Sequence, residues 1–351
     1  MKYTLPLLAL ALATLSTDAA LIRSEDGRFR TPTAVAAISA DADTNRKCHT
    51  TNGDFVAALA PGKYASSSFH KCFRTDAQIF QFLDTLASQN SQILTKFQIS
   101  TSFKGEKIWA YKISTGSRAK ALYTQSMLHA REWVAGSSAV FTIASILDDV
   151  ANKKPTPADS YDLVFVPIVN IDGYRITWSS KRLQRKNANE VDLNRNWYTP
   201  IRNPSPPRPS DETYPGPSYF SEKETQGIRD YITARNATFA GYLDVHSFAG
   251  EVQLPYGDTK AALGNGLDTK YQTLGDALST AMGSSYTTTF EWEMYLSYGC
   301  FEDWGQRYLN KPTLTIEMAG NDFVAPASTI VSSGKELYRG YYAFANGVSK
   351  F

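Results

Sequence analysis

The chain of 351 residues has few cysteines and histidines and almost no net charge. Three cysteines exclude a scaffold held together mainly by disulfides. Thirty-six Lys and Arg residues against 34 Asp and Glu residues leave a net charge of +2, which is too small to attract nucleic acid or an anionic membrane. Hydrophobic residues make up 42% of the chain, enough for a large core. We therefore expect a large folded protein with no nucleic-acid partner.

The first 20 residues have the pattern of a secretory signal peptide. Met1 and Lys2 form a short basic start, residues 5–15 are apolar, and small residues around Ala19 and Ala20 suit cleavage. The apolar run is about half as long as the ~20 residues that a membrane span needs. No later segment resembles a span. We predict a signal peptide over residues 1–20 and a secreted, extracellular protein.

The cysteines and the next 40 residues indicate how the mature chain begins. Cys48 and Cys72 lie 24 positions apart and could form a disulfide after export, which leaves Cys300 as a buried thiol. Residues 21–61 lack large apolar side chains at regular spacing. We expect this stretch to be a short pro-segment or an N-terminal extension, followed by the main domain over residues 62–351.

Helical patterns and short apolar runs alternate along the main domain. A capping-box sequence at Thr75 predicts a helix that runs to about Leu86, and a second capping box at Ser221 predicts one over residues 221–234. Apolar residues at helical spacing predict three more helices, over residues 133–150, 271–282 and 331–348. Four apolar runs bounded by turns indicate buried strands over residues 121–128, 163–169, 241–245 and 313–316. This alternation predicts an α/β fold: a single large domain with a mixed, mainly parallel twisted sheet and helices on both faces.

A polar residue follows each predicted strand: His129, Asn170, His246 and Glu317. Ligands of open α/β sheets bind beyond the carboxyl ends of the strands, so these side chains should converge on one crevice. Glu132 lies three residues after His129, and on a strand-to-helix turn both can face one point. Two imidazoles and a carboxylate suit a catalytic zinc, which keeps its fourth position open. A lone His-x-x-Glu is common by chance, so the remaining residues decide between coincidence and a zinc site.

From about residue 65 the chain resembles the zinc metallocarboxypeptidases of the pancreatic carboxypeptidase A/B type. The matching segments occur in the family's order and at closely similar spacing: His129–Trp133, Asn170–Tyr174, Arg182–Lys186, Val191–Trp197, Glu212–Tyr214, His246–Ser247, Tyr295, Asp303–Trp304 and Thr315–Glu317. The resemblance implies that residues 62–351 form a catalytic domain of the metallocarboxypeptidase fold with one zinc ion, held by the two histidines and the glutamate named above.

The resemblance also implies the roles of the residues around the metal. Asp192 corresponds to a carboxylate that hydrogen-bonds a ligand imidazole and orients it. Glu317 corresponds to the general base, which accepts a proton as water attacks the scissile carbonyl. Arg185 corresponds to the guanidinium that stabilises the developing oxyanion. Arg131 and Arg182 correspond to auxiliary basic positions along the substrate path, with a structural ion pair as the alternative, above all for Arg182.

Two further positions correspond to residues that bind the end of the substrate. Asn194 and Arg195 match the groups that hold a terminal carboxylate, and a bidentate arginine suits that ligand. Such a clamp indicates an exopeptidase, because an endopeptidase has no use for it. Tyr295 matches the mobile aromatic residue that caps the substrate, and Tyr298 replaces it if this loop carries an insertion.

The C-terminal side chain preferred by the enzyme depends on Glu302. This position, just before Asp303, corresponds to the base of the side-chain pocket, which is apolar in the A type and an aspartate in the B type. A carboxylate there would attract a cation and repel an acidic side chain, so we predict a preference for C-terminal Lys or Arg. The alternative is the A-type preference for aromatic or aliphatic residues, because Phe290 and Met294 are apolar and Glu302 could turn to solvent.

The leading hypothesis is thus a secreted, monomeric zinc exopeptidase acting on peptides and proteins with a free C-terminal carboxylate. Two other functions remain as alternatives. The chain could be an inactive secreted binding protein on this fold, although all three ligands and Glu317 are present. It could also be a different amide hydrolase on the same scaffold, against which the pair Asn194 and Arg195 argues.

Overall fold

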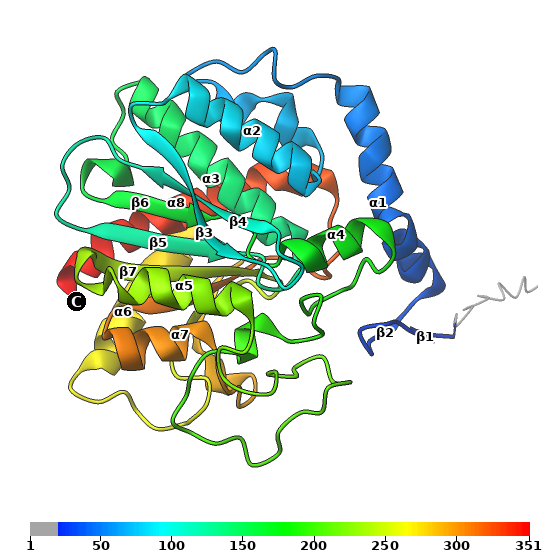
Figure 1. Ribbon diagram of the computed structural model, residues 1–351, viewed down its shortest axis with the longest axis vertical. Coiled ribbons are helices and arrows are strands. Elements are labelled where there is room, and N and C mark those ends of the chain that lie inside the picture. The colour runs from blue at the N-terminus through cyan, green and yellow to red at the C-terminus, as the bar shows by residue number, and fades with distance from the viewer. Residues whose placement is uncertain (1–19) are drawn as a thin grey trace, which may run out of the picture.

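The computed structural model describes residues 20–351, so the predicted signal peptide lies almost wholly outside the described residues. A mixed sheet of eight strands runs through the domain, with helices on both faces (Figure 1). In spatial order the strands are β3 (Leu94–Thr101), β4 (Lys107–Ile113), β6 (Asp162–Val166), β5 (Ala121–Ser126), β7 (Phe239–Ser247), β10 (Thr313–Met318), β8 (Glu251–Leu254) and β9 (Thr287–Phe290). The predicted α/β class and single domain are confirmed.

The four central strands, β6, β5, β7 and β10, run parallel to one another. They correspond to the four strands predicted from the sequence. On either side the neighbouring strands, β4 and β8, run antiparallel to this group. The carboxyl ends of four parallel strands therefore lie along one edge of the sheet, where polar side chains can meet.

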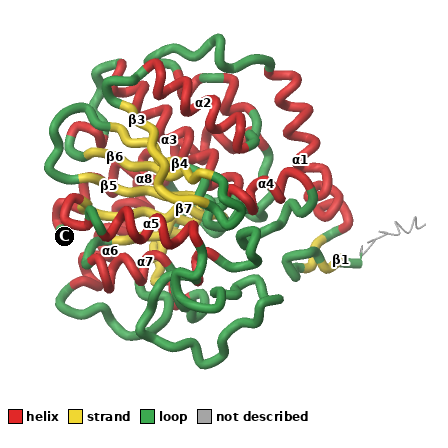
Figure 2. The backbone as a smooth tube through the Cα atoms, viewed as in Figure 1, coloured by secondary structure: helices red, strands yellow, loops and turns green. Residues whose placement is uncertain are grey.

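Helices cover both faces of the sheet (Figure 2). On one face α3 (Trp133–Ala151), α6 (Leu267–Met282) and α8 (Ile330–Gly347) pack together, while α5 (Lys223–Thr233) and the short α7 (Phe301–Trp304) lie on the other. Near the edge of the sheet, α2 (Asp76–Gln89) packs against α3 and α4 (Ile171–Ser179). These helices agree with the five predicted ones to within a few residues and add two short ones.

The two predicted capping boxes have different outcomes. Thr75 caps α2 as expected, because its hydroxyl accepts from the Gln78 amide and the Gln78 side chain accepts from the Thr75 amide. The prediction of a capping box at Ser221 is wrong, since the N-cap of α5 is Glu222 and the helix begins at Lys223. The Ser221 hydroxyl instead donates to the Glu222 carboxylate at 2.7 Å, which removes it from the helix amides.

Helix α3 is an exception to the expectation that no later segment resembles a membrane span. Within residues 20–351 it is the one helix that is long and apolar enough to cross a membrane by length and composition, and most of it is buried inside the domain. Its apolar side chains fill the core between the sheet and α8.

The N-terminal stretch is ordered and packed against the domain. It contains a short hairpin, β1 (Ile22–Arg23) and β2 (Phe29–Arg30), and a 21-residue helix, α1 (Pro32–Asn52), which runs along the rim of the molecule beside α4 (Figure 1). A disulfide between Cys48 and Cys72 joins α1 to the main domain, as expected, and Cys300 is a buried free thiol. The helix has no apolar stripe, which is why the sequence pattern did not predict it.

Candidate active site

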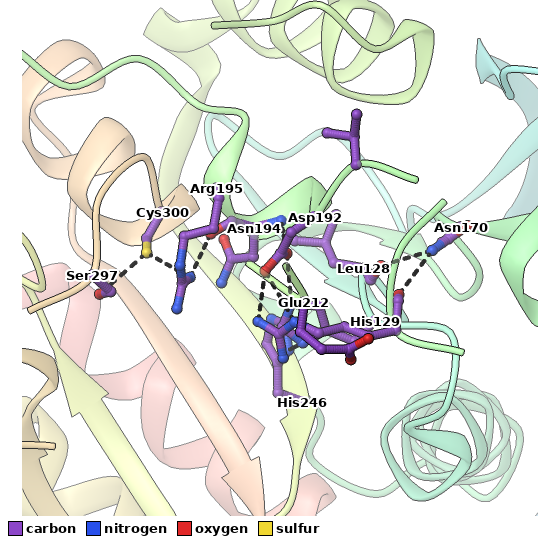
Figure 3. Close-up of polar contacts among 12 residues, drawn as sticks. Leu128, His129, Asn170, Asp192, Asn194, Arg195, Glu212, His246, Ser297 and Cys300 are labelled. Carbon is purple, nitrogen blue, oxygen red and sulfur yellow. Dashed lines mark hydrogen bonds and ion pairs between the residues drawn. The ribbon is translucent and has the colours of Figure 1, made fainter. Parts of the chain in front are cut away.

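The carboxyl ends of β5, β7 and β10 bring three of the predicted site residues together. His129 lies three residues beyond the end of β5, and His246 lies near the end of β7. In the parallel register of β10 and β7, Glu317 is paired directly with His246. Asn170 follows β6 and supports the turn that carries His129, since its amide donates to the carbonyls of Leu128 and Arg185 (Figure 3).

His129, Glu132 and His246 form a compact, buried cluster. Glu132 Oε1 lies 2.9 Å from His129 Nδ1, its Oε2 lies 2.9 Å from His246 Nδ1, and the two Nδ1 atoms are 3.0 Å apart. Two imidazole nitrogens at this distance can hydrogen-bond each other only if one is protonated. A cation bound to both nitrogens and the carboxylate removes that conflict, and this donor set suits zinc.

A carboxylate lies behind each of the two histidines. Asp192 Oδ1 is 3.0 Å from His129 Nε2, the contact expected from the sequence. Asp244 Oδ2 is 3.1 Å from His246 Nε2, within ion-pair distance although outside good hydrogen-bond geometry. Sequence reasoning missed Asp244, yet a signal was present: it precedes His246 by two positions on one strand, which places both side chains on the same face. Each pair leaves the Nδ1 atom free to face the metal position.

Charges within the cluster determine its ionisation. Burial by itself would raise the pKa of Glu132, but the two imidazoles beside it lower that pKa overall. Burial would lower the pKa of His246, whereas Asp244 and Glu132 raise it well above its usual value. Burial would raise the pKa of Asp192, but the neighbouring Arg185 and His129 side chains bring it well below the usual range. The carboxylates are therefore held in their charged forms, as a metal site requires.

Arg185 and Glu317 line one cavity next to this cluster. Arg185 contacts Asp192 Oδ2 through Nε at 2.9 Å and through Nη2 at 2.8 Å, so Asp192 orients both an imidazole and a guanidinium. Burial and the neighbouring charge of Glu132 raise the pKa of Glu317 to about 8. A bound divalent cation would oppose this shift, since positive charge favours the carboxylate.

Arg195 lies at the opposite side of the same cavity. Its Nη2 donates to the Tyr295 hydroxyl at 3.0 Å. Its Nη1 lies 3.0 Å from Cys300 Sγ (Figure 3). Asn194 lies beside Arg195, and the Asn194 Oδ1 atom accepts a hydrogen bond from the Phe301 backbone amide at 2.9 Å. These contacts require a close approach of the chain at Gly299, which has φ 81° and where a Cβ would lie 2.4 Å from the Arg195 carbonyl oxygen.

Glu302 is fully buried beside this cavity and does not turn to solvent. Its Oε2 accepts a hydrogen bond from the Thr315 hydroxyl at 3.0 Å. Thr315 itself lines the cavity, together with His129, Arg185, Asn194, Arg195, Gln253, Glu291, Met294, Tyr295 and Glu317. Among these, sequence reasoning missed Gln253 and Glu291, which no local motif marks.

Comparison with known proteins identifies the family. Residues 79–340 match the model of the family described as zinc carboxypeptidase. The chain belongs to the zinc carboxypeptidase family. It is a metallocarboxypeptidase by this membership, with the α/β domain and the histidine and glutamate cluster described above.

Several known members of the family are similar to this chain. Carboxypeptidase A5 of Homo sapiens is 29% identical over 299 residues, covering 78% of this chain and 66% of its own length. The zinc carboxypeptidase of Simulium vittatum is 27% identical over 283 residues, covering 75% of this chain and 92% of its own. This chain thus spans just under two thirds of the length of the human relative and nearly all of the Simulium one.

Among solved structures, the fold is similar to that of carboxypeptidase A from Helicoverpa armigera. The TM-score is 0.77 at 23% identity, covering 92% of this chain and 83% of the other. Bovine thrombin-activatable fibrinolysis inhibitor gives a TM-score of 0.73 at 21% identity, covering 80% of this chain and 99% of its own. At such identities the likeness establishes the fold alone.

The two remaining basic residues of this zinc carboxypeptidase are engaged with other parts of the chain. Arg182 is buried against Asp41 of α1 at 2.7 Å and donates to the carbonyls of Arg131 and Phe323. Arg131 contacts the Glu212 carboxylate at 3.0 Å, and its guanidinium lies over the Phe323 ring. In this structure both guanidinium groups therefore have partners within the protein.

A larger cavity of about 560 Å³ adjoins the one lined by Glu317 and Arg185. The loop before α5 contributes much of its wall, including Pro206, Pro215 and Tyr219. Arg195 and Tyr295 line both cavities. Tyr295 is about half exposed, so its side chain is accessible from solvent.

Proposed function

We propose that the protein is a secreted, zinc-dependent exopeptidase that releases single residues from the C-terminus of peptides and proteins, with C-terminal Lys or Arg preferred. One observation carries this proposal: His129 of the candidate metal cluster, Glu317 and the buried Arg195 line a single cavity. A metal site beside a carboxylate suits hydrolysis, and a buried guanidinium on the other side suits a terminal carboxylate.

His129, Glu132 and His246 are the residues that would hold one zinc ion. When bound, zinc supplies Lewis-acid chemistry, which polarises the scissile carbonyl and makes water a better nucleophile at neutral pH. Asp192 keeps the His129 imidazole in the tautomer that presents Nδ1, and the Asp244 carboxylate, 3.1 Å from His246 Nε2, favours the same orientation of His246.

Glu317 acts as the general base. Its carboxylate accepts the proton of the attacking water and then donates it to the leaving amine. Arg185 stabilises the oxyanion that develops on the scissile carbonyl. Because Asp192 contacts its Nε and Nη2, Nη1 is the nitrogen that remains for the substrate.

Arg195 and Asn194 bind the terminal carboxylate of the substrate. The Tyr295 hydroxyl occupies Arg195 Nη2 in this structure, so it must move when a carboxylate takes that position. This requirement fits a tyrosine that caps the substrate after it binds. Arg131 would contribute a weaker basic contact farther along the substrate path, where it competes with Glu212.

The preference for Lys or Arg rests on the complete burial of Glu302 beside the cavity. A buried carboxylate is stabilised by a cationic partner and destabilised by an acidic one. The second candidate is a preference for aromatic or aliphatic C-terminal residues, which the A-type names of relatives such as human carboxypeptidase A5 and A1 favour.

We further propose that residues 21–61 form an extension that stays attached to the catalytic domain of residues 62–351. The Cys48–Cys72 disulfide supports this, because a cut between residues 53 and 61 would leave α1 covalently bound. Disulfides of this kind form in oxidising compartments, in line with secretion. Mass spectrometry of the secreted, unreduced protein would find an N-terminus near residue 20, whereas loss of α1 would show a released pro-segment.

We expect the protein to be a monomer.

The decisive experiment compares a matched pair of peptides ending in Arg or Phe. The purified protein should release both residues, Arg faster, and a zinc chelator should abolish both reactions. The Glu317→Gln variant should lower kcat about 10²–10⁴-fold, the usual contribution of a general base, while its zinc content stays unchanged. Faster release of Phe would favour the A-type preference. No release by zinc-loaded protein would overturn the proposed activity.

A further inference from the structure

Two buried glutamates, Glu291 and Glu302, lie together beside the cavity. Glu291 is 8% exposed and Glu302 is 0% exposed. One carboxylate oxygen from each lies within 4.8 Å of the other and of Cys300 Sγ. Glu291 comes from the turn before Tyr295 and lines the cavity, whereas Glu302, in α7, lies behind Thr315.

Each of these carboxylates has one oxygen with a hydrogen bond and one without. Glu291 Oε1 accepts from the Ser297 hydroxyl at 2.5 Å, and Glu302 Oε2 accepts from Thr315 at 3.0 Å. Glu291 Oε2 and Glu302 Oε1 are buried and find no hydrogen-bond partner in the part of the chain that the structure describes. A buried carboxylate oxygen without a partner is costly, which points to a partner that arrives from outside the protein.

The cations nearest to this pair are engaged elsewhere. Arg307 contacts both oxygens of Asp258 at 2.5 Å. Asp303, the other acidic residue here, accepts from the backbone amides of Gly257 and Asp258. Arg195 donates to Tyr295 and to its neighbour's carbonyl, and its proposed ligand is the terminal carboxylate of the substrate. Arg195 and Arg307 therefore have other partners, and the two unpartnered oxygens beside the cavity belong to Glu291 and Glu302.

Glycine at position 257 maintains the space around Glu291. A Cβ there would lie 2.7 Å from the Glu291 carboxylate and 2.4 Å from the Ser297 hydroxyl. Any larger residue would push the carboxylate out of its place. Glycine at position 257 therefore leaves space in the cavity wall for the Glu291 carboxylate.

We propose that Glu291 is a second specificity-determining carboxylate, which binds the cationic side chain of a C-terminal Arg or Lys together with Glu302. This inference rests on the proposed function. The guanidinium of arginine carries five donors in a planar fork and can contact two carboxylates at once. Glu291 lines the cavity and Glu302 lies behind Thr315, and a carboxylate oxygen of each lies within 4.8 Å of the other. An arginine side chain can therefore form more directional hydrogen bonds to the pair than lysine, whose single ammonium offers less directional contacts.

A different role for Glu291 would be to position Arg195, whose guanidinium is close enough for the charge of Glu291 to favour its protonated form. Glu291 would then matter for every substrate, because each has a terminal carboxylate. The two roles therefore differ in a measurable way: a side-chain contact affects substrates ending in Arg or Lys only, whereas an effect through Arg195 extends to those ending in Phe.

The test measures kcat/KM for matched peptides ending in Arg, Lys and Phe, using the zinc-loaded protein and the variants Glu291→Gln and Glu302→Gln. Glutamine keeps the shape and the acceptor for Ser297 but loses the charge. Loss of a charge-assisted contact should lower kcat/KM for Arg about 10–100-fold in each variant. Release of Phe should stay within about twofold, which also shows that the variants fold. Glu293→Gln, on the same turn but exposed, is the matched control and should match the wild type for all three peptides.

Each outcome separates this inference from the proposed function. If the wild type prefers Arg and only Glu302→Gln reduces that preference, the role of Glu291 is overturned and the Lys/Arg specificity stands. An equal loss for Arg and Phe in Glu291→Gln would assign Glu291 to Arg195 and also overturn the inference. If the wild type itself prefers Phe, the proposed specificity fails, and this inference fails with it.

Discussion

At the scale of single residues, Asp192 links the metal cluster to the substrate side of the cavity. One of its oxygens faces His129 and the other contacts Arg185 twice. The Asn194 amide also donates to it at 2.9 Å, so the same carboxylate helps to place the residue next to Arg195. Buried polar networks of this kind stabilise one arrangement because every alternative leaves a charge unpaired.

Replacing Asp192 by Asn should weaken zinc binding about 10–100-fold, because the neutral amide no longer holds His129 in the right tautomer. Asp244→Asn should have a similar effect through His246. The measurement is the zinc content after dialysis against a buffered chelator. Asp276→Asn, an exposed change on α6, is the control, and zinc retention by Asp192→Asn equal to that of the control would contradict the prediction.

At the scale of elements, α1 depends on charge pairs with residues far along the chain. The Asp41–Arg182 pair is buried and joins α1 to the loop that carries Arg185. Arg30, just before α1, contacts both oxygens of Asp322 at 2.7 and 2.9 Å. Such contacts position a helix only when the rest of the domain has already formed.

The Asp41→Asn change should lower the free energy of unfolding by about 3–5 kcal/mol, since it leaves Arg182 buried without a counter-charge. Urea denaturation followed by circular dichroism measures this loss. The matched control is Asp43→Asn on the same helix, whose partner Arg46 is also exposed, so the expected change is below about 1 kcal/mol. Equal effects of the two substitutions would show that the buried pair has no special part in holding α1.

Glu224, near the start of α5, should make stability depend on pH. Burial, with Glu222 and Asp172 nearby, raises its pKa from 4.5 to about 7. Because the folded protein binds this proton more tightly than the unfolded chain, the associated stability is complete below pH 4.5 and is lost as pH rises through about 7.

Glu224→Gln should remove that loss. We expect its Tm to exceed that of the wild type at pH 8 by more than at pH 4.5, as measured by thermal scans at both values. Asp230→Asn, exposed on the same helix, should show no such dependence on pH. A constant Tm difference between Glu224→Gln and the wild type across this range would rule out the titration of Glu224 as the cause.

At the scale of the whole molecule, the metal cluster joins distant parts of the domain. His129 and His246 are 117 residues apart in sequence, and they come from the ends of two strands that are neighbours in the sheet. A ligand that binds only the folded state stabilises the entire domain, by about 4 kcal/mol at a thousandfold excess over its Kd.

Adding zinc to chelator-treated protein should therefore raise the Tm by several degrees, and a thermal scan with and without the metal measures this directly. His246→Ala should not respond, because it lacks one of the three donors. A wild-type Tm that does not change with zinc would argue against a metal site formed by the folded domain.

The sequence predicted those elements of the fold and those site residues that a local sequence pattern marks without ambiguity. The four central strands are buried on both faces, and where all their residues are apolar they appear as continuous apolar runs, for example over residues 163–166. Strands β3, β4, β8 and β9 were not predicted. In β3 buried and exposed positions follow each other irregularly, and its pairing depends on partners elsewhere in the chain.

The same distinction holds for the site. His129, Glu132, His246 and Glu317 were identifiable because parallel strands end at one edge, which makes the position of a residue after a strand informative. Glu291 could not be identified in this way, because it lies in a turn without a sequence motif. Its interest comes only from the side chains around it, Glu302 and Cys300, which are brought there by the fold. By itself the sequence determined the fold class, through the periodicity of its helices and strands, and the family, through a resemblance carried by motifs in the family's order. The metal-binding side chains that it indicates stay a prediction. The tertiary structure alone decided that α1 packs on Arg182, that Asp244 supports His246, and that two carboxylate oxygens lie unpaired beside the cavity, because burial and pairing arise only between segments far apart in the chain.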